Sequence, residues 1–135
     1  MDEFLGIQSI LRPQSELVRR EEDRTLQLLV MIQGLPHIVE QERFSRNEWC
    51  VLIPILEAYP GYAAYAVLLA ALIDVPRSSV QHRLEEARRL KTLRQELRAV
   101  RDAVFHADQK ITSFGLTLAP IHEYGYTLAL LQENP

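Results

Sequence analysis

The chain has 135 residues, with 15 Lys or Arg and 18 Asp or Glu, which gives a formal net charge of −3. This length suits one domain, and a composition of 47% hydrophobic and 24% charged residues excludes a fully disordered chain. The longest uncharged apolar run, residues 62–73, is far shorter than the roughly 20 residues that cross a bilayer, so we expect no membrane span.

The first 24 residues are predicted to be an N-terminal arm and a charged connector, followed by a single domain at 25–135. Apolar residues between Phe4 and Leu11, followed by Pro13, indicate a short helical turn or an arm docked on the body. The sequence Arg-Arg-Glu-Glu-Asp-Arg at 19–24 indicates the connector. Because the start Met-Asp-Glu lacks the basic residues and apolar stretch of a signal peptide, we expect a cytoplasmic protein.

Two short strands, over residues 25–33 and 37–40, are predicted next. The apolar run 29–32 ends at Gly34, and Gly-Leu-Pro at 34–36 supplies the turn between the strands. A single helix over 15–33 is the open alternative, because Leu, Gln, Arg and Glu are good helix formers.

A capped helix is predicted to begin at Ser45. Ser45-Arg46-Asn47-Glu48 is a capping box, in which the serine oxygen accepts a main-chain N–H and the glutamate reaches back to the N-cap. Apolar residues follow at helical spacing: Trp49, Leu52, Ile53 and Leu56. Pro54 predicts a local bend, and Tyr-Pro-Gly at 59–61 ends the helix. Cys50, the only cysteine, cannot form an internal disulfide, which also favours the reducing cytoplasm.

Two further helices are predicted between residues 62 and 90. Residues 62–73 are apolar nearly all round, which indicates a buried helix ended by Asp-Val-Pro at 74–76. A helix over 78–90 would be capped by Ser78 or Ser79. Its inward residues would be Val80, Leu84 and Ala87.

The last predicted elements are a long helix at 93–112 and a hairpin at 116–130. The helix carries an apolar stripe with spacings of four and three residues: Leu93, Leu97, Val100, Val104, Ala107 and Ile111. Gly115 is a signal for the end of a helix. Apolar residues then alternate on both sides of a glycine-bearing turn, which predicts two strands. The predicted fold class is therefore α+β, mostly helical, with short N-terminal strands.

Basic residues concentrate in residues 76–113, which hold nine Lys or Arg against five Asp or Glu, a balance of +4 in an acidic chain. Such a block is a candidate for contact with phosphates. The alternative is a solvated helix surface on which these bases pair with nearby acids, since i,i+4 ion pairs are ordinary on exposed helices.

Three segments share the pattern of a known family. Lys-Ile-Thr-Ser-Phe-Gly-Leu-Thr-Leu at 110–118 is similar to the end of a recognition helix followed by Gly-Leu-x-Ile. Tyr-Gly-Tyr-Thr-Leu at 124–128 is similar to a wing that closes in Gly-Tyr-x-Leu, and residues 44–49 look like Leu-Thr-x-x-Glu-Phe at the start of a first helix. Over roughly residues 25–130 the chain thus resembles the winged-helix effector domain of OmpR/PhoB-type response regulators.

This resemblance implies a winged helix-turn-helix that binds double-stranded DNA and regulates transcription. The recognition helix would be about 93–112 and the wing about 116–130. The implied DNA contacts are Arg94, Arg98, Arg101, His106, Gln109 and Lys110 on the helix, and His122 and Tyr124 on the wing. Arg98 and Arg101 lead this set because a guanidinium binds guanine edges or phosphates with two hydrogen bonds, and Gln109 could read adenine.

The chain also departs from the family pattern. Asp108 stands where the family has an arginine, and Glu123 where it has a glycine. Asp102 and Asp108 place carboxylates on the predicted recognition helix, where they would repel phosphates. The sequence contains no receiver domain, so we expect no phosphorylation control of that type. A winged-helix protein-interaction or assembly module that does not bind DNA is therefore the alternative function.

A second helix competes for the DNA-binding role. Residues 74–79 look like the turn of a helix-turn-helix that leads into the predicted helix at 78–90. The contacts of this alternative would be Arg77, Ser79 and Arg83.

Neither catalysis nor a cofactor is expected. His37, His82, His106 and His122 show no i,i+4 pairing and no nearby cysteine pair, so zinc spacing is missing. We therefore expect no enzyme and no metal site, with DNA as the main partner and a protein as a further one.

A homodimer is expected as well. A lone winged helix reads only a few base pairs, so such domains commonly pair to lengthen their site. The apolar residues between Phe4 and Leu11 either cover the chain's own core or pack against a second copy. We expect the second, because the charged connector would let the arm reach away from the body.

Overall fold

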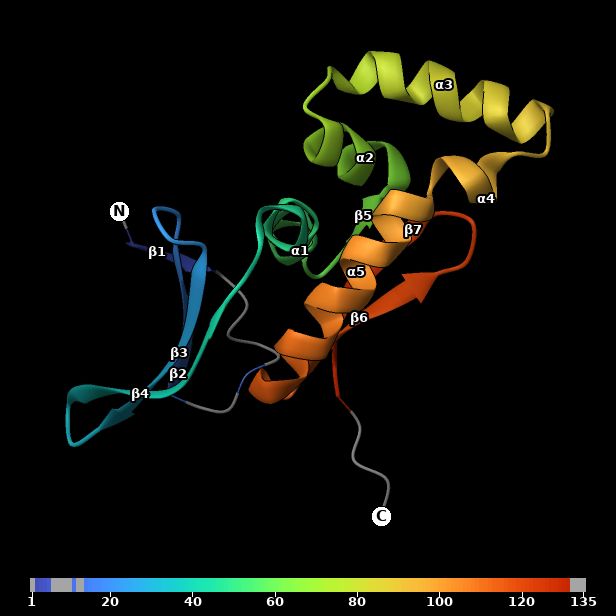
Figure 1. Cartoon of the computed structure of the whole chain (residues 1–135). Coiled ribbons are helices and arrows are strands. Elements are labelled where there is room, and N and C mark those ends of the chain that lie inside the picture. The colour runs from blue at the N-terminus through green and yellow to red at the C-terminus, as the bar shows by residue number, and fades with distance from the viewer. Residues whose placement is uncertain (1, 6–10, 12–13, 132–135) are drawn as a thin grey trace.

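The chain folds into an N-terminal antiparallel sheet and a helical body that is closed by a second, smaller sheet (Figure 1). The computed structural model describes residues 2–5, 11 and 14–131. The α+β class is as predicted, although the N-terminal strands form a complete four-stranded sheet. No helix within these residues is long and apolar enough to cross a membrane.

The first sheet contains four strands in the order β1-β2-β3-β4, all antiparallel. They are β1 (Asp2–Leu5), β2 (Ser15–Arg20), β3 (Thr25–Ile32) and β4 (Leu35–Arg43). The two predicted strands are confirmed, and the alternative helix over 15–33 is wrong. The connector prediction is wrong over 19–20, which belong to β2, so the sheet crosses the predicted boundary at residue 24.

The N-terminal arm does not reach away from the body where the structure describes it. Residues 2–5 pair with β2, and Leu11 packs against the hydrophobic core. The described part of the arm is therefore docked on the chain's own body, and its contact with a second copy stays a prediction. The arm residues Ile7 and Ile10 lie outside the described residues.

The β3–β4 turn falls one residue earlier than predicted. Gln33 and Gly34 have φ values of 53° and 78°, the positive pair that a two-residue hairpin turn requires. Pro36 therefore lies inside β4, opposite Met31. Proline is tolerated there because β4 is the edge strand of this sheet as far as the structure describes the chain.

Helix α1 (Arg46–Ala58) begins with the predicted capping box. The Glu48 N–H donates to Ser45 Oγ at 3.2 Å, and the Ser45 N–H donates to Glu48 Oε1 at 2.7 Å. Its predicted apolar stripe is buried, and the helix continues through Pro54.

The predicted helix at 62–73 is two elements. Residues Tyr62–Ala64 form strand β5, which pairs with a C-terminal strand, and α2 (Tyr65–Ile73) follows. Helix α3 (Arg77–Arg89) is confirmed with its predicted inward residues buried. Its N-cap position is Pro76, so neither Ser78 nor Ser79 caps it.

The predicted helix at 93–112 is interrupted at Leu97. Helix α4 (Leu93–Glu96) is one turn, and α5 (Arg98–Ile111) carries the rest of the apolar stripe. A short 3-10 helix, η1 (Thr112–Phe114), leads to Gly115, whose φ of 77° ends the segment. Strands β6 (Leu116–Ile121) and β7 (Gly125–Leu130) form the predicted hairpin, and β5 extends it in the order β5-β7-β6.

Helix α1 lies between the N-terminal sheet and the other helices (Figure 1). Leu17 and Leu26 from the sheet join one hydrophobic core with α1, α2, α5 and the second sheet. Phe44 and Trp49 meet at this junction, with ring centroids 5.9 Å apart. The shared core fixes α5 beside α1, which leaves the opposite face of α5 exposed.

Candidate nucleic-acid interface

The exposed face of α5 carries most of the predicted contacts. The side chains at Arg98, His106 and Gln109 are exposed, and Arg101 is half-buried. Phe105 shares this face with 60% of its surface exposed. Arg94 precedes them on α4, and because of the break at Leu97 it does not continue the same helical face.

A basic pocket of about 440 Å³ lies where α4 meets α5. Its lining residues are Lys91, Thr92, Arg94, Gln95, Arg98 and Arg101. The structure thus brings together three predicted contacts, Arg94, Arg98 and Arg101, and adds Lys91. Four of the six side chains are cationic and none is a carboxylate.

The acid between the arginines of this pocket is paired elsewhere. Glu96 stands between Arg94 and Arg98 in the sequence, but its carboxylate accepts a hydrogen bond from Arg83 Nε at 2.6 Å. Within the described part of the chain, the four pocket cations make no ion pair and no hydrogen bond through their side chains. The lining of the pocket therefore presents positive charge to solvent, and the exposed carboxylate of Asp102 is next to Arg101 in the sequence.

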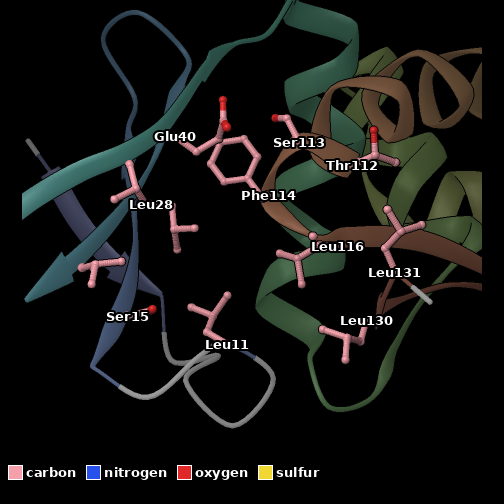
Figure 2. Close-up of a pocket in the computed structure, with 13 residues that line it drawn as sticks. Leu11, Ser15, Leu28, Glu40, Thr112, Ser113, Phe114, Leu116, Leu130 and Leu131 are labelled. Atoms are coloured by element: carbon pink, nitrogen blue, oxygen red, sulfur yellow. The ribbon is translucent and has the colours of Figure 1, made fainter. Parts of the chain in front are cut away.

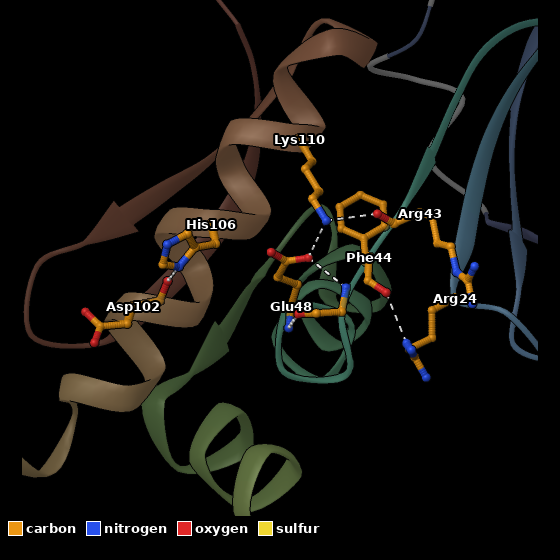
Figure 3. A network of polar contacts seen from close by, with 8 residues as sticks. Arg24, Arg43, Phe44, Glu48, Asp102, His106 and Lys110 are labelled. Carbon is orange, nitrogen blue, oxygen red and sulfur yellow. Dashed lines mark hydrogen bonds and ion pairs between the residues drawn. The ribbon is translucent and has the colours of Figure 1, made fainter.

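Lys110 is not part of the exposed face (Figure 3). Its Nζ donates to Glu48 Oε1 at 2.7 Å and to the Arg43 main-chain oxygen at 2.9 Å. It also lies over the Phe44 ring, 5.6 Å from the centroid. These contacts correct the outward position predicted for Lys110, because its ammonium joins α5 to α1 and β4.

The Glu48 carboxylate is charged in this cluster. Burial alone would raise the pKa of Glu48, but hydrogen bonds from Lys110 and from the Ser45 N–H, with the Lys110 charge, outweigh burial. The net effect is a pKa below the ordinary value of 4.5. The pair is therefore ionic at neutral pH, and the ammonium of Lys110 is engaged in contacts within the chain.

Asp108 faces the second sheet rather than the exposed face of α5. Its Oδ1 accepts hydrogen bonds from the Leu118 N–H and the Thr117 hydroxyl, both at 2.7 Å. The repulsion of phosphates that the sequence indicated for this carboxylate is therefore removed. Asp102 is exposed, so its repulsion remains.

His106 is oriented by its own helix (Figure 3). Its Nδ1 lies 2.8 Å from the Asp102 main-chain oxygen. Because a carbonyl oxygen can only accept, Nδ1 carries the proton, and in the neutral ring Nε2 is an acceptor. His106 can therefore accept from a base amino group.

The β6–β7 turn lies against α3. His122 exposes 95% of its side chain, and Tyr124 exposes 60% and meets Tyr62 edge-on at 6.1 Å. Arg88 Nη2 donates to the Glu123 main-chain oxygen at 3.3 Å. The two predicted wing contacts are thus accessible at the tip of the hairpin.

The competing helix α3 has fewer unpaired basic side chains than the segment of α4 and α5 has. Arg77 and Ser79 are exposed at its start. Arg83 is paired with Glu96, Arg89 with Glu86, and Arg88 with the β6–β7 turn. Among the described residues, Arg94, Arg98 and Arg101 on α4 and α5 make no such contact, which favours α5 as the nucleic-acid-binding helix.

A second cavity, of about 510 Å³, separates the N-terminal sheet from the C-terminal end of α5 (Figure 2). Aliphatic side chains such as Leu28, Leu116 and Leu130 line most of it, and no basic side chain does. The buried Ser15 hydroxyl has no hydrogen-bond partner among the described residues. This cavity does not suit a phosphate ligand.

The described residues contain no group of three His, Cys, Asp or Glu that could hold a metal ion. Comparison of the chain with protein-family models, with curated proteins and with solved structures gives no match.

Proposed function

We propose that this chain is a cytoplasmic, winged-helix transcriptional regulator that binds double-stranded DNA. The observation that carries the proposal is the set of unpaired arginines at the start of α5, which continues into an exposed face ending at Gln109. In an acidic chain, such a cluster provides a local positive potential that attracts phosphates.

The order of elements supports a winged helix of the OmpR/PhoB type. Helix α5 is followed by the β6–β7 hairpin, which pairs with β5 ahead of α2. In this proposal α5 enters the major groove and the hairpin is the wing. Arg98 and Arg101 bind phosphates or guanine edges, Gln109 and His106 read bases, and Tyr124 lies beside the backbone.

A fluorescence-anisotropy titration of mixed-sequence duplex DNA tests the proposal. We expect binding at micromolar protein and low salt, falling steeply as salt rises because counterions are released. Arg98→Ala is expected to weaken binding by about 1–3 kcal/mol, the usual cost of a lost arginine contact.

Arg77→Ala is the matched control, because it removes an exposed arginine from the start of α3. Absence of binding at low salt would refute DNA binding by this chain. A larger loss of DNA affinity for Arg77→Ala than for Arg98→Ala would indicate that α3, rather than α5, contacts DNA.

The second candidate is a protein-interaction module, and a separate surface favours it. The distal end of the β3–β4 hairpin projects from the body (Figure 1). It exposes large apolar side chains. They are Met31, Ile32, Leu35, Ile38 and Val39, with exposed fractions from 37% to 64%. Such a surface is typical of a protein contact. We propose that this surface pairs with a second copy of the chain, so that the protein is a homodimer under either candidate function.

A further inference from the structure

The pocket between α4 and α5 is built around a strained residue. Lys91 has a φ of 58°, the left-handed region in which a residue other than glycine costs roughly 1 kcal/mol or more. The turn is held by main-chain hydrogen bonds from Lys91 to Arg88 at 3.2 Å and from Thr92 to Ala87 at 2.8 Å. This turn places Lys91 in the lining of the pocket.

The positive charge of the pocket is complementary to an anion that carries several negative charges. Lys91, Arg94, Arg98 and Arg101 repel one another, and no carboxylate lines the pocket to offset them. A single phosphodiester of DNA carries only one negative charge. A pyrophosphate group concentrates the charge of two phosphates in a compact volume, and therefore matches four cations better than one backbone phosphate does.

The N-terminus of α5 lies at the same place. Arg98 is the first residue of α5, and Leu97 at the N-cap position offers no side-chain cap. The positive end of the helix dipole therefore adds to the charge of the arginines.

The size of the pocket suits a small phosphorylated molecule. Its volume of about 440 Å³ falls within the range of roughly 300–1,000 Å³ that small-molecule sites occupy. Thr92 and Gln95 provide uncharged hydrogen-bonding groups in the lining. A pyrophosphate group can therefore be bound together with part of the molecule that carries it.

We propose that this pocket binds the pyrophosphate group of a small phosphorylated molecule, such as a nucleoside diphosphate. Arg98 and Arg101 also belong to the face proposed for DNA, so a bound pyrophosphate competes with DNA. This competition rests on the proposed function, whereas pyrophosphate binding itself does not.

Calorimetric titration of the full chain with sodium pyrophosphate tests the site, with sodium sulfate at equal ionic strength as the reference anion. Saturable binding is expected for pyrophosphate, at least tenfold tighter than for sulfate. The double variant Arg94→Ala/Arg98→Ala should lose at least tenfold in affinity. The double variant Arg77→Ala/Arg89→Ala removes the same charge from α3 and should bind as the wild type does.

The variant Lys91→Gly distinguishes a loss of pyrophosphate binding from a loss of stability. Glycine relieves the positive φ, so this variant should be at least as resistant to urea as the wild type and yet bind pyrophosphate several-fold more weakly. Equal affinity for sulfate and pyrophosphate, or an equal loss in the α3 control variant, would overturn the site.

A competition titration on labelled duplex distinguishes the two proposals. Displacement of DNA by pyrophosphate, reduced in Arg94→Ala/Arg98→Ala, is the expected result. Pyrophosphate binding without DNA binding would reject the DNA-binding function and leave the pocket assignment intact. DNA binding without pyrophosphate binding would reject the pocket assignment.

Discussion

Glu48 connects three parts of the fold through one carboxylate. It completes the cap of α1 at Ser45 and accepts from Lys110 of α5, whose ammonium also binds the last residue of β4. Only 12% of the Glu48 side chain is exposed, so solvent screens this cluster less than an ordinary surface pair. The position of α5 against α1 therefore depends on a charge that the sequence showed only as part of a helix cap.

Glu48→Gln should lower the free energy of unfolding by about 1–2 kcal/mol at pH 7, because it removes a charge-assisted hydrogen bond. The folded-state pKa of Glu48 lies below 4.5, so its ionised form stabilises the fold above that pH. This stability is lost as the pH falls through the folded-state pKa. Urea denaturation at pH 7 and in acid should show the wild type approaching the variant as the pH falls.

The control is Glu85→Gln, which removes an exposed glutamate from α3. Its free energy of unfolding should follow the wild-type pH dependence. A Glu48→Gln difference that stayed constant from neutral to acid pH would argue against the ionic cluster.

At the scale of elements, the sequence predicted what local pattern determines. The capping box predicted the start of α1, and the three inward apolar residues predicted α3. The alternation of apolar residues predicted the β6–β7 hairpin. Each of these signals lies within one segment of the sequence. Strand β5 was missed because its pairing partner Gly125–Leu130 is about sixty residues away, and residues 62–73 carry no local sign of it. Likewise the spacing of the apolar stripe continues through Leu97, whereas the helix itself is interrupted there.

Gly125 is the residue on which the second sheet depends most. A Cβ atom at this position would lie 1.9 Å from the Ala63 main-chain oxygen, so β5 and β7 could not keep their spacing. Gly125→Ala should therefore cost about 2–3 kcal/mol in urea denaturation, as overpacked sites do.

Gly61→Ala is the matched control, since its nearest atom would be 3.1 Å away and the clash is mild. A loss of stability in Gly61→Ala as large as in Gly125→Ala would contradict the close approach of β5 and β7.

At the scale of the whole molecule, the site was predicted in part. The basic character of residues 94–101 follows from composition, but the pocket requires the turn at Lys91 and the pairing of Glu96 with Arg83. The inward positions of Lys110 and Asp108 depend on α1 and β6, which helical spacing alone does not reveal. The positions of the charged residues could be read from the sequence. Which of these charges are paired depends on tertiary contacts.

The proposed homodimer predicts a mass of two chains in light scattering. Ile38→Lys places a charge on the exposed apolar end of the β3–β4 hairpin and should give monomers. Leu90→Lys is the control, because Leu90 is similarly exposed, at 55%, but follows α3. A monomeric wild type, or a dimer unaffected by Ile38→Lys, would refute this interface.

The pairing of β5 with β7 also sets an order of assembly. The first sheet is a meander whose neighbours follow one another along the chain, so its hairpins close short loops. Tyr62 meets Thr127 only after four α-helices, the 3-10 helix η1 and β6 have intervened. Closing that long loop costs chain entropy before its contacts are made. The N-terminal sheet is therefore expected to form early in folding. Pairing of β5 with β7 is expected to form late and to fix the final position of α5.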